Sequence, residues 1–475
     1  MTTTRRAKIV CTLGPASSSY QMIDKLVHAG MDVARLNFSH GTHEDRARMV
    51  ASLRRASFRY EKPVGILADL QGPKIRTGIL EQGKPVRLRF GQRFTITTRK
   101  IVGTEEGVST TFHALPEAVH KGDRILLSDG DIALRVISTR GPDVITQVEN
   151  GGELGQHQGI NLPGIKLNIP SMTPKDRKDL VSALSLGANY VALSFVRTAA
   201  DVRAAKNAIA RAGKATPVIA KLEKPEAIDN LDEILAVADV VMVARGDLGV
   251  EMSPEKVPVV QKRIISKARN ALIPVITATQ MLDSMQKNPR PTRAEASDVA
   301  NAIFDGSDAL MLSGETAAGL YPLESVEMMD RIITEAEASV ITLPRPARSG
   351  DLQINEAIAE AICHAAEELN LKVVAVFTES GSSAGLVSKY RPRAPIVAFS
   401  PLQETRRRLA LFWGVLPRSM GRVYDIDKLA TAAEERLLEE KLVKRGDIVG
   451  VVAGTPIGAT GSTNFMRLLR IGGQS

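Results

Sequence analysis

The chain has 475 residues and a formal net charge of +9, from 62 basic and 53 acidic side chains. Its hydrophobic content of 44% is enough for sizeable buried cores, which excludes a disordered chain. Basic residues are spread along the chain and only 4% of residues are aromatic, so a nucleic-acid binder is not expected and the excess charge favours small anionic ligands.

Cysteine usage and hydropathy indicate the compartment. No apolar run approaches the roughly 20 residues of a membrane span, and the run after Arg5-Arg6 is soon broken by Gly and Pro, unlike a signal peptide. The 2 cysteines, Cys11 and Cys363, form no CxxC pair. We therefore expect a cytoplasmic enzyme in a reducing compartment, with about three domains of roughly 150 residues each.

Strand-like segments alternate with helical patterns along most of the chain. Strands are expected at residues 8–13, 33–38, 64–70, 190–195, 218–223, 240–245, 274–280 and 309–314, with helices at, for example, 18–29, 201–212, 227–238 and 257–270. Such alternation produces right-handed βαβ units and a parallel sheet. Eight units predict a closed TIM (β/α)8 barrel, whose chemistry lies at the carboxyl ends of the strands.

The carboxyl ends of these strands are polar. They carry Arg35, Asn37, Asp69, Ser194, Lys221, Glu223, Arg245, Asp247, Thr277, Thr279 and Ser313. One polar strand end could arise by chance in a loop, but polar ends on seven of the eight strands indicate a single active site.

The alternation stops between Gly72 and about Pro170. Short β-type runs at 86–90, 93–98, 124–127, 132–137 and 143–149 are separated there by turns rich in Gly, Asp and Pro. This predicts a small β-barrel module inserted after the third strand, placed to act as a lid. Thr173-Pro174, with Asp176 three residues after the threonine, then has the signature of a helix start.

Pro344, Pro346 and Gly350 interrupt the pattern again. Beyond them, helices are expected at 355–369, 385–390, 405–412 and 430–444, and strands at 373–378, 396–400 and 448–453, which indicates an open α/β domain. We therefore predict a catalytic barrel at 1–71 and 169–343, a β lid domain at 72–168 and a C-terminal α/β regulatory domain at 344–475.

Residues 218–223 and 240–249 are the most informative segments. Because side chains alternate along a strand, Lys221 and Glu223 lie on one face, and Asp247 follows the next strand. A Lys, a Glu and an Asp suit a metal-assisted reaction on an anionic substrate. The alternative is a plain buried Lys–Glu ion pair.

Six sequence blocks resemble the pyruvate kinase family, in its bacterial, potassium-independent branch. They are residues 8–15 (KIVCTLGP), 35–41 (RLNFSHG), 69–78 (DLQGPKIRTG), 242–249 (MVARGDLG), 278–282 (ATQML) and 311–316 (MLSGET), in the family's order. The resemblance implies a glycolytic, allosterically regulated homotetramer that converts phosphoenolpyruvate and ADP to pyruvate and ATP with Mg²⁺ or Mn²⁺.

The resemblance also implies roles for the polar strand ends. Phosphoryl transfer depends mainly on positioning and on cancelling charge at the phosphoryl oxygens. Lys221, Arg35 and Thr279 would be catalytic. The substrate would contact Arg35, Lys221, Gly246, Asp247 and Thr279, and the divalent ion would be held by Glu223 and Asp247.

Nucleotide contacts are implied at Asn37, His40 and Arg76. The chain has no GxxxxGK[ST] segment, so a P-loop is excluded. Gln158 replaces a lysine that members often carry before the Gly-(Ile/Val)-Asn-Leu-Pro-Gly segment, and a neutral amide cannot supply that charge. The effect of Gln158 on nucleotide binding stays open.

A monovalent-cation site is implied at Asn37, Ser39, Asp69 and the carbonyl of Leu70. Lys74 occupies a position that is usually glutamate in members that need potassium, and its ammonium can supply the charge of the ion. We therefore expect that K⁺ is not required. The alternative is that Lys74 only pairs with a surface acid.

The segment 378–384 joins a strand to a helix and offers Thr378, Ser380, Ser382 and Ser383. Hydroxyls and backbone N–H groups at a helix start can bind an anion. The loop resembles the phosphate pocket of the family's allosteric activators, which predicts a phosphorylated effector. An ordinary capped helix start is the alternative.

Two other functions are considered. A Mg²⁺-dependent aldolase or lyase on a similar barrel would also bind an enolate-forming acid through a Glu and an Asp, but gives no reason for the lid or for Lys221. A catalytically silent metabolite-binding regulator would be expected to have lost Lys221 or a metal-binding acid, and this chain keeps them.

Overall fold

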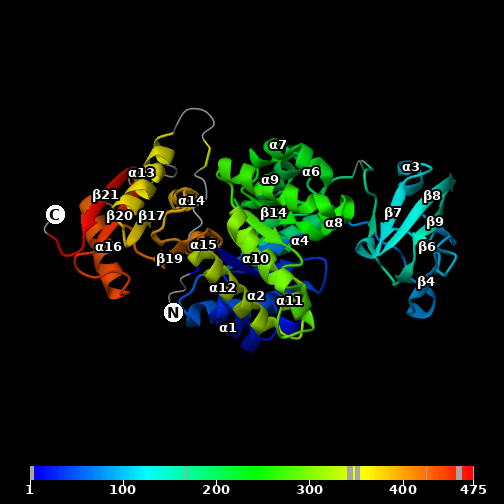
Figure 1. Ribbon diagram of the computed structural model, residues 1–475, viewed down its shortest axis with the longest axis horizontal. Helices are drawn as coiled ribbons and strands as arrows, with labels where there is room; N and C mark the ends of the chain where they lie inside the picture. The colour runs from blue at the N-terminus through cyan, green and yellow to red at the C-terminus, as the bar shows by residue number, and fades with distance from the viewer. Residues whose placement is uncertain are drawn as a thin grey trace.

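The computed structural model describes residues 5–165, 167, 169–339, 346–347, 353–423, 425–455 and 463–473. Figure 1 shows three parts in a row, with the barrel in the middle, the insert at one end and the C-terminal domain at the other. Within the described ranges, no helix is both long and apolar enough to cross a membrane.

Eight parallel strands close into a barrel in the order β1-β16-β15-β14-β13-β12-β3-β2, which confirms the predicted fold. They are β1 Lys8–Leu13, β2 Val33–Asn37, β3 Gly65–Asp69, β12 Tyr190–Leu193, β13 Val218–Leu222, β14 Val240–Ala244, β15 Val275–Ala278 and β16 Ala309–Leu312. Nearly all their residues are buried, because each strand lies between a filled barrel interior and an outer layer of helices.

Several barrel helices begin at a threonine with an acid three residues on. This capping box precedes α2 (His43–Arg59), α4 (Pro174–Ser185), α5 (Ala199–Arg211) and α10 (Arg293–Asp305). The predicted helix start at Thr173 is thereby confirmed. The remaining barrel helices are α1 Tyr20–Ala29, α6 Pro225–Asp229, α7 Leu231–Leu235, α8 Arg245–Glu251, α9 Val257–Asn270, α11 Gly314–Ala317 and α12 Pro322–Ala338.

Among its described residues, the insert consists of β-strands and loops with one short α-helix, α3 (Leu115–Ala118), and two 3-10 turns, Glu81–Gly83 and Ser128–Gly130. Six strands form one sheet in the order β11-β7-β8-β9-β5-β6, and β10 pairs with β4 in a second sheet. Their bounds are β4 Val86–Leu88, β5 Arg93–Thr97, β6 Gly107–Ser109, β7 Arg124–Leu127, β8 Ile132–Arg140, β9 Asp143–Asn150, β10 Gly152–Leu154 and β11 Ile160–Asn161. Sequence patterns missed β6, β10 and β11, which are too short to show a period.

The C-terminal domain has one sheet in the order β19-β18-β17-β20-β21. Its elements are α13 Ile354–Glu368, β17 Val373–Phe377, α14 Ser382–Lys389, β18 Ile396–Ser400, α15 Gln403–Leu409, β19 Val415–Ser419, α16 Ile426–Glu439, β20 Ile448–Gly454 and β21 Thr463–Arg470. The edge strands β19 and β21 were not predicted. The predicted domain division at residue 344 lies outside the described residues.

This domain covers the base of the barrel, at the amino ends of its strands. Leu411 belongs to the same buried cluster as the side chains that fill the barrel interior. Asp308, just before β16, accepts hydrogen bonds from Lys389 at 2.8 Å and Arg391 at 2.9 Å. The base is therefore sealed by protein, and the carboxyl ends of the strands form the mouth.

Candidate functional site

Lys221, at the end of β13, lies between two carboxylates at the barrel mouth. Its Nζ is 2.7 Å from Glu223 Oε1 and 3.3 Å from Asp69 Oδ1, and it donates to Ser194 Oγ at 2.8 Å. Leu222 faces the opposite way, into the core under the helices. The predicted shared face of Lys221 and Glu223 is confirmed.

Arg35 extends this cluster from β2. Its Nε and Nη2 each lie 2.7 Å from Asp69 Oδ2, and Nη1 donates to Thr12 Oγ1 at 3.0 Å. Asp69 thus joins the two cations Arg35 and Lys221 and fixes their spacing. The sequence assigned Asp69 only to a monovalent-cation position, because its bridging role depends on three strands that are far apart in the chain.

Burial and pairing shift the pKa values in the cluster. Burial alone would lower the pKa of Lys221, but Asp69 and Glu223 outweigh burial and raise it. Burial would raise the pKa of Asp69, but Lys221 and Arg35 lower it. Burial raises the pKa of Glu223 against the attraction of Lys221, and Asp247 adds repulsion. Lys221 therefore stays charged. For Glu223, the positive charge of Lys221 does not fully offset the effects of burial and of Asp247.

Glu223 and Asp247 fit a divalent cation. No group of three or more His, Cys, Asp or Glu side chains that could hold a metal occurs among the described residues. Mg²⁺ commonly takes only one or two carboxylates and completes its octahedron with water and substrate. A cation would also relieve the repulsion between Glu223 and Asp247. The N–H of Phe195 donates to Glu223 Oε2 at 2.8 Å and so orients this carboxylate.

Asp247 belongs to the first turn of α8, which follows β14 without a loop. The N–H of Gly246 donates to Thr279 Oγ1 at 2.7 Å, so these two predicted site residues are brought together. Thr279 has a φ of 70°, an uncommon value for a β-branched residue. Arg245 holds this turn by donating to the Thr279 carbonyl at 2.7 Å and pairing with Asp298 at 2.6 Å. The sequence placed Arg245 at the mouth but did not reveal this supporting role.

Asn37 ends β2, and Ser39 and His40 lie in the turn that follows. Asn37 Oδ1 accepts the N–H of Ser39 at 2.9 Å. Arg46, from α2, donates to the His40 carbonyl at 2.5 Å, and its guanidinium lies 4.2 Å from the ring centroid of Phe38. Sequence reasoning missed Arg46, because an arginine within an amphipathic helix carries no motif.

Cations surround His40 at the edge of the mouth. Burial, followed by Arg76, Lys74 and Arg35, lowers the pKa of His40, so the imidazole is biased toward its neutral form. Arg76 Nη1 donates to the His157 carbonyl at 2.8 Å, which joins the beginning of the insert to its end. The structure thus places two of the predicted nucleotide residues, His40 and Arg76, in one electropositive region.

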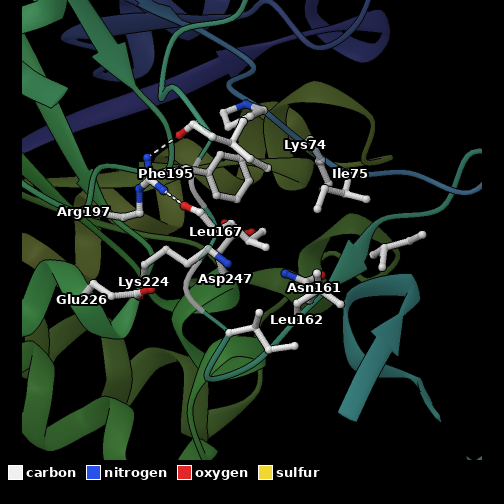
Figure 2. A pocket seen from close by; sticks show the side chains of 14 residues that line it. Lys74, Ile75, Asn161, Leu162, Leu167, Phe195, Arg197, Lys224, Glu226 and Asp247 are labelled. Carbon is white, nitrogen blue, oxygen red and sulfur yellow. Dashed lines mark hydrogen bonds between the residues drawn. The ribbon is translucent and has the colours of Figure 1, made fainter. Parts of the chain in front are cut away.

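A pocket lies between the barrel and the insert, beside Asp247 (Figure 2). Its walls are mostly apolar, and the polar groups that line it are Lys74, Asn161, Arg197, Lys224, Glu226 and Asp247. Arg197 donates to the carbonyls of Leu167 and Ile169, in the chain that returns from the insert. Figure 2 shows Arg197 beside Leu167. The pocket therefore lies at the junction between the insert and the barrel.

Lys74 Nζ lies 3.8 Å from Asp129 Oδ1, and the Asp129 side chain is 76% exposed. This is the pairing with a surface acid considered as the alternative for Lys74. Its replacement of a monovalent cation near Asn37, Ser39 and Asp69 stays a prediction.

The predicted effector loop lies in the C-terminal domain, before α14. Ser380 and Ser382 are exposed and their hydroxyls are 2.9 Å apart. Thr378 Oγ1 accepts the N–H of Gly381 at 2.9 Å, and buried Ser383 pairs with Thr463 at 2.6 Å. Glu379 is paired with Arg422 at 3.0 Å. Two hydroxyls therefore face solvent and two stabilise the loop.

Known proteins resemble this chain over almost its whole length. Residues 4–326 match the family described as pyruvate kinase, barrel domain, and residues 356–469 match pyruvate kinase, alpha/beta domain. A pyruvate kinase from Geobacillus stearothermophilus is 46% identical over 470 residues, covering 98% of this chain and 80% of the relative. One from Mycobacterium tuberculosis is 47% identical over 469 residues, covering 99% of each. A crystal structure of a pyruvate kinase from Cryptosporidium parvum has a TM-score of 0.90 and 37% identity, covering 98% of this chain and 96% of that one.

Proposed function

Since the chain belongs to the pyruvate kinase family, which transfers the phosphoryl group of phosphoenolpyruvate to ADP, we propose that the charged cluster at the barrel mouth performs this transfer. The observation that carries the proposal is Lys221, held between Glu223 and Asp69 with Arg35 on the far side of Asp69. The family assignment does not favour the aldolase or lyase alternative.

Lys221 and Arg35 would bind the phosphoryl group from two directions. Arg35 presents a planar, permanently charged fork that suits phosphate oxygens. Lys221 would stabilise the charge that develops on the transferred group and on the enolate left behind. Since Asp69 fixes the spacing of the two cations, little reorganisation is needed when the substrate binds.

Glu223 and Asp247 would hold Mg²⁺ or Mn²⁺, which would neutralise substrate oxygens. Gly246 would contact the substrate carboxylate, and Thr279 would lie near the substrate methylene, where the enolate is protonated. Their own hydrogen bond, from N–H to hydroxyl, keeps both groups in place for these roles. A hydroxyl is a weak acid, so a water relay would deliver the proton to the enolate.

Asn37, His40 and Arg76 would contact the ADP phosphates. The support is the cationic surroundings of His40, which come from Arg76, Lys74 and Arg35. Lys74 would supply the positive charge that a potassium ion gives in other members. The enzyme would then work without K⁺.

A phosphorylated effector would bind at Thr378, Ser380, Ser382 and Ser383. The exposed hydroxyls of Ser380 and Ser382 and the pairing of Glu379 with Arg422 support this site, because the acid is neutralised. We further propose that the protein is a cytoplasmic homotetramer. Within each chain, the domain boundaries would lie at residues 72, 169 and 344.

A coupled assay of pyruvate formation tests the activity. Phosphoenolpyruvate, ADP and Mg²⁺ should give pyruvate, and omitting ADP or adding a chelator should stop it. Pyruvate release in the absence of ADP would contradict phosphoryl transfer to a nucleotide.

A further inference from the structure

One buried carboxylate lies between the insert and the barrel mouth. Glu251 is the last residue of α8, and its side chain is 2% exposed. Oε1 accepts Nδ2 of Asn161 from the insert at 3.0 Å and Nζ of Lys224 from the barrel at 2.6 Å. Figure 2 shows Asn161 and Lys224 extending toward one another from opposite sides of the pocket.

On the barrel side, Glu251 is connected to both proposed metal ligands. Lys224 directly follows Glu223, and Glu251 lies one helical turn after Asp247. Lys224 Nζ is also 5.7 Å from the ring centroid of Phe195, the residue whose N–H orients Glu223. The Lys224–Glu251 pair therefore joins the two backbone segments that carry the metal-binding carboxylates.

On the other side, Glu251 is connected to the main sheet of the insert. Asn161 ends β11, which pairs with β7. The turn Ser128–Gly130 of the insert also packs near Val250, the neighbour of Glu251 on α8. The insert therefore packs against the last turn of α8.

We propose that Glu251 is a positioning residue that holds both the orientation of the insert and the geometry of the Glu223–Asp247 pair, each through a different partner. The claim about the metal-binding carboxylates rests on the proposed function, whereas the claim about the orientation of the insert does not. Glu251 makes two contacts that can be tested separately, here called its arms. The Asn161 arm is the hydrogen bond that fixes the orientation of the insert, and the Lys224 arm is the ion pair that fixes the positions of the metal-binding carboxylates. Removing either partner leaves the buried Glu251 carboxylate with a lost hydrogen bond, which is unfavourable and gives each arm a measurable effect.

The Asn161 arm is tested by the distance between spin labels at Lys121→Cys on the insert and Lys287→Cys on the barrel. Both positions are exposed, whereas Cys11 and Cys363 are buried. Asn161→Ala and Glu251→Ala should broaden the distance distribution. Glu251→Gln keeps an oxygen that accepts from Asn161, so it should leave the distribution narrow. Glu255→Gln, at an exposed position four residues on, is the matched control and should change nothing.

The Lys224 arm is tested by Mn²⁺ binding, measured from the electron paramagnetic resonance signal of free Mn²⁺. Glu251→Gln and Lys224→Met should raise the Kd about tenfold, as expected for residues that orient metal ligands. Asn161→Ala should leave the Kd unchanged. In the coupled assay, Asn161→Ala should raise the KM for ADP more than it lowers kcat, because Arg76, a proposed nucleotide contact, belongs to the insert.

Glu251→Ala with wild-type distances and wild-type Mn²⁺ affinity would overturn the proposal, even if the variant melts earlier. Weaker Mn²⁺ binding in Asn161→Ala would contradict the separation of the two arms. If the wild type makes no pyruvate and binds no Mn²⁺, the proposed function fails, and the label distances still decide the Asn161 arm. If Glu251→Ala does not fold, Asn161→Ala and Glu251→Gln each test one arm.

Discussion

The two ends of the barrel use buried charge differently. At the base, both oxygens of Asp308 are hydrogen-bonded, Oδ1 to Arg391 and Oδ2 to Lys389 and the N–H of Val275. At the mouth, Asp69 Oδ1 and Ser313 Oγ are buried without a hydrogen-bond partner, although Lys221 Nζ is 3.3 Å from that carboxylate oxygen. At the base, Arg391 Nε and Nη1 are also buried without a hydrogen-bond partner, so the two ends differ in what the charges do. The base uses its charges to hold two domains together, whereas the unpaired oxygens at the mouth lie where a polar substrate can use them.

The largest effect is expected at the mouth, from Lys221→Met. Because Lys221 acts mainly on charge in the transition state, kcat should fall about 10³-fold or more, while phosphoenolpyruvate and Mn²⁺ still bind. Steady-state kinetics and ligand titration measure the two separately. Near-wild-type turnover would rule out the role of Lys221.

At the base, Asp308→Asn should reduce stability rather than catalysis. Lys389 and Arg391 would lose a buried partner, which should lower the free energy of unfolding by about 3–5 kcal/mol. Urea unfolding measures the loss, with kcat of the folded enzyme expected near wild type. The matched control is Asp232→Asn, whose 76% exposed side chain pairs with Lys267 and should contribute less than about 1 kcal/mol.

The effector loop begins the helix α14, whose last residue, Lys389, pairs with Asp308. A sugar phosphate or nucleoside monophosphate should lower the half-saturating phosphoenolpyruvate concentration, with a coupling of about 1–3 kcal/mol. Ser382→Asp should abolish the response because its charge repels phosphate, and Asn370→Asp, elsewhere on the same domain, should preserve it. An unchanged saturation curve across a broad metabolite panel would make the loop a structural cap.

Asp32, also at the base, should make stability depend on acid pH. Burial would raise its pKa, but Arg5, Lys62 and Lys8 lower it from 3.8 to about 2. A lowered folded-state pKa gives stability that is present above 3.8 and is lost as the pH falls toward 2. Between pH 6 and pH 3, wild type should lose about 1 kcal/mol more than Asp32→Asn in urea unfolding. Equal losses would show that Asp32 is not the titrating group.

The smallest effect concerns potassium at the mouth. With Mg²⁺ in a buffer free of sodium and potassium, wild type should keep near-full activity, and Lys74→Glu should become potassium-dependent. Strong activation of wild type by K⁺, with tetramethylammonium inert at matched ionic strength, would contradict the proposal. In that case the pairing of Lys74 with Asp129 would be its whole role.

The sequence by itself determined the barrel, the all-β insert and the face shared by Lys221 and Glu223. These features depend on local periodicity, since buried parallel strands are continuous apolar runs and strand side chains alternate. The capping box at Thr173 is equally local, so its helix was predicted correctly. The short strands β6, β10 and β11 were missed because two or three residues show no period.

Only the tertiary structure decided which distant residues support the site. Asp69 joins Arg35 to Lys221, Arg46 holds the turn after β2, and Glu251 joins Asn161 to Lys224. The partners in these contacts come from separate elements, and no pattern along the chain encodes which strand ends or helix faces meet. Barrel closure and the docking of the insert set the longest of these contacts, because they bring residues such as Asn161 and Glu251, 90 positions apart, within hydrogen-bond distance.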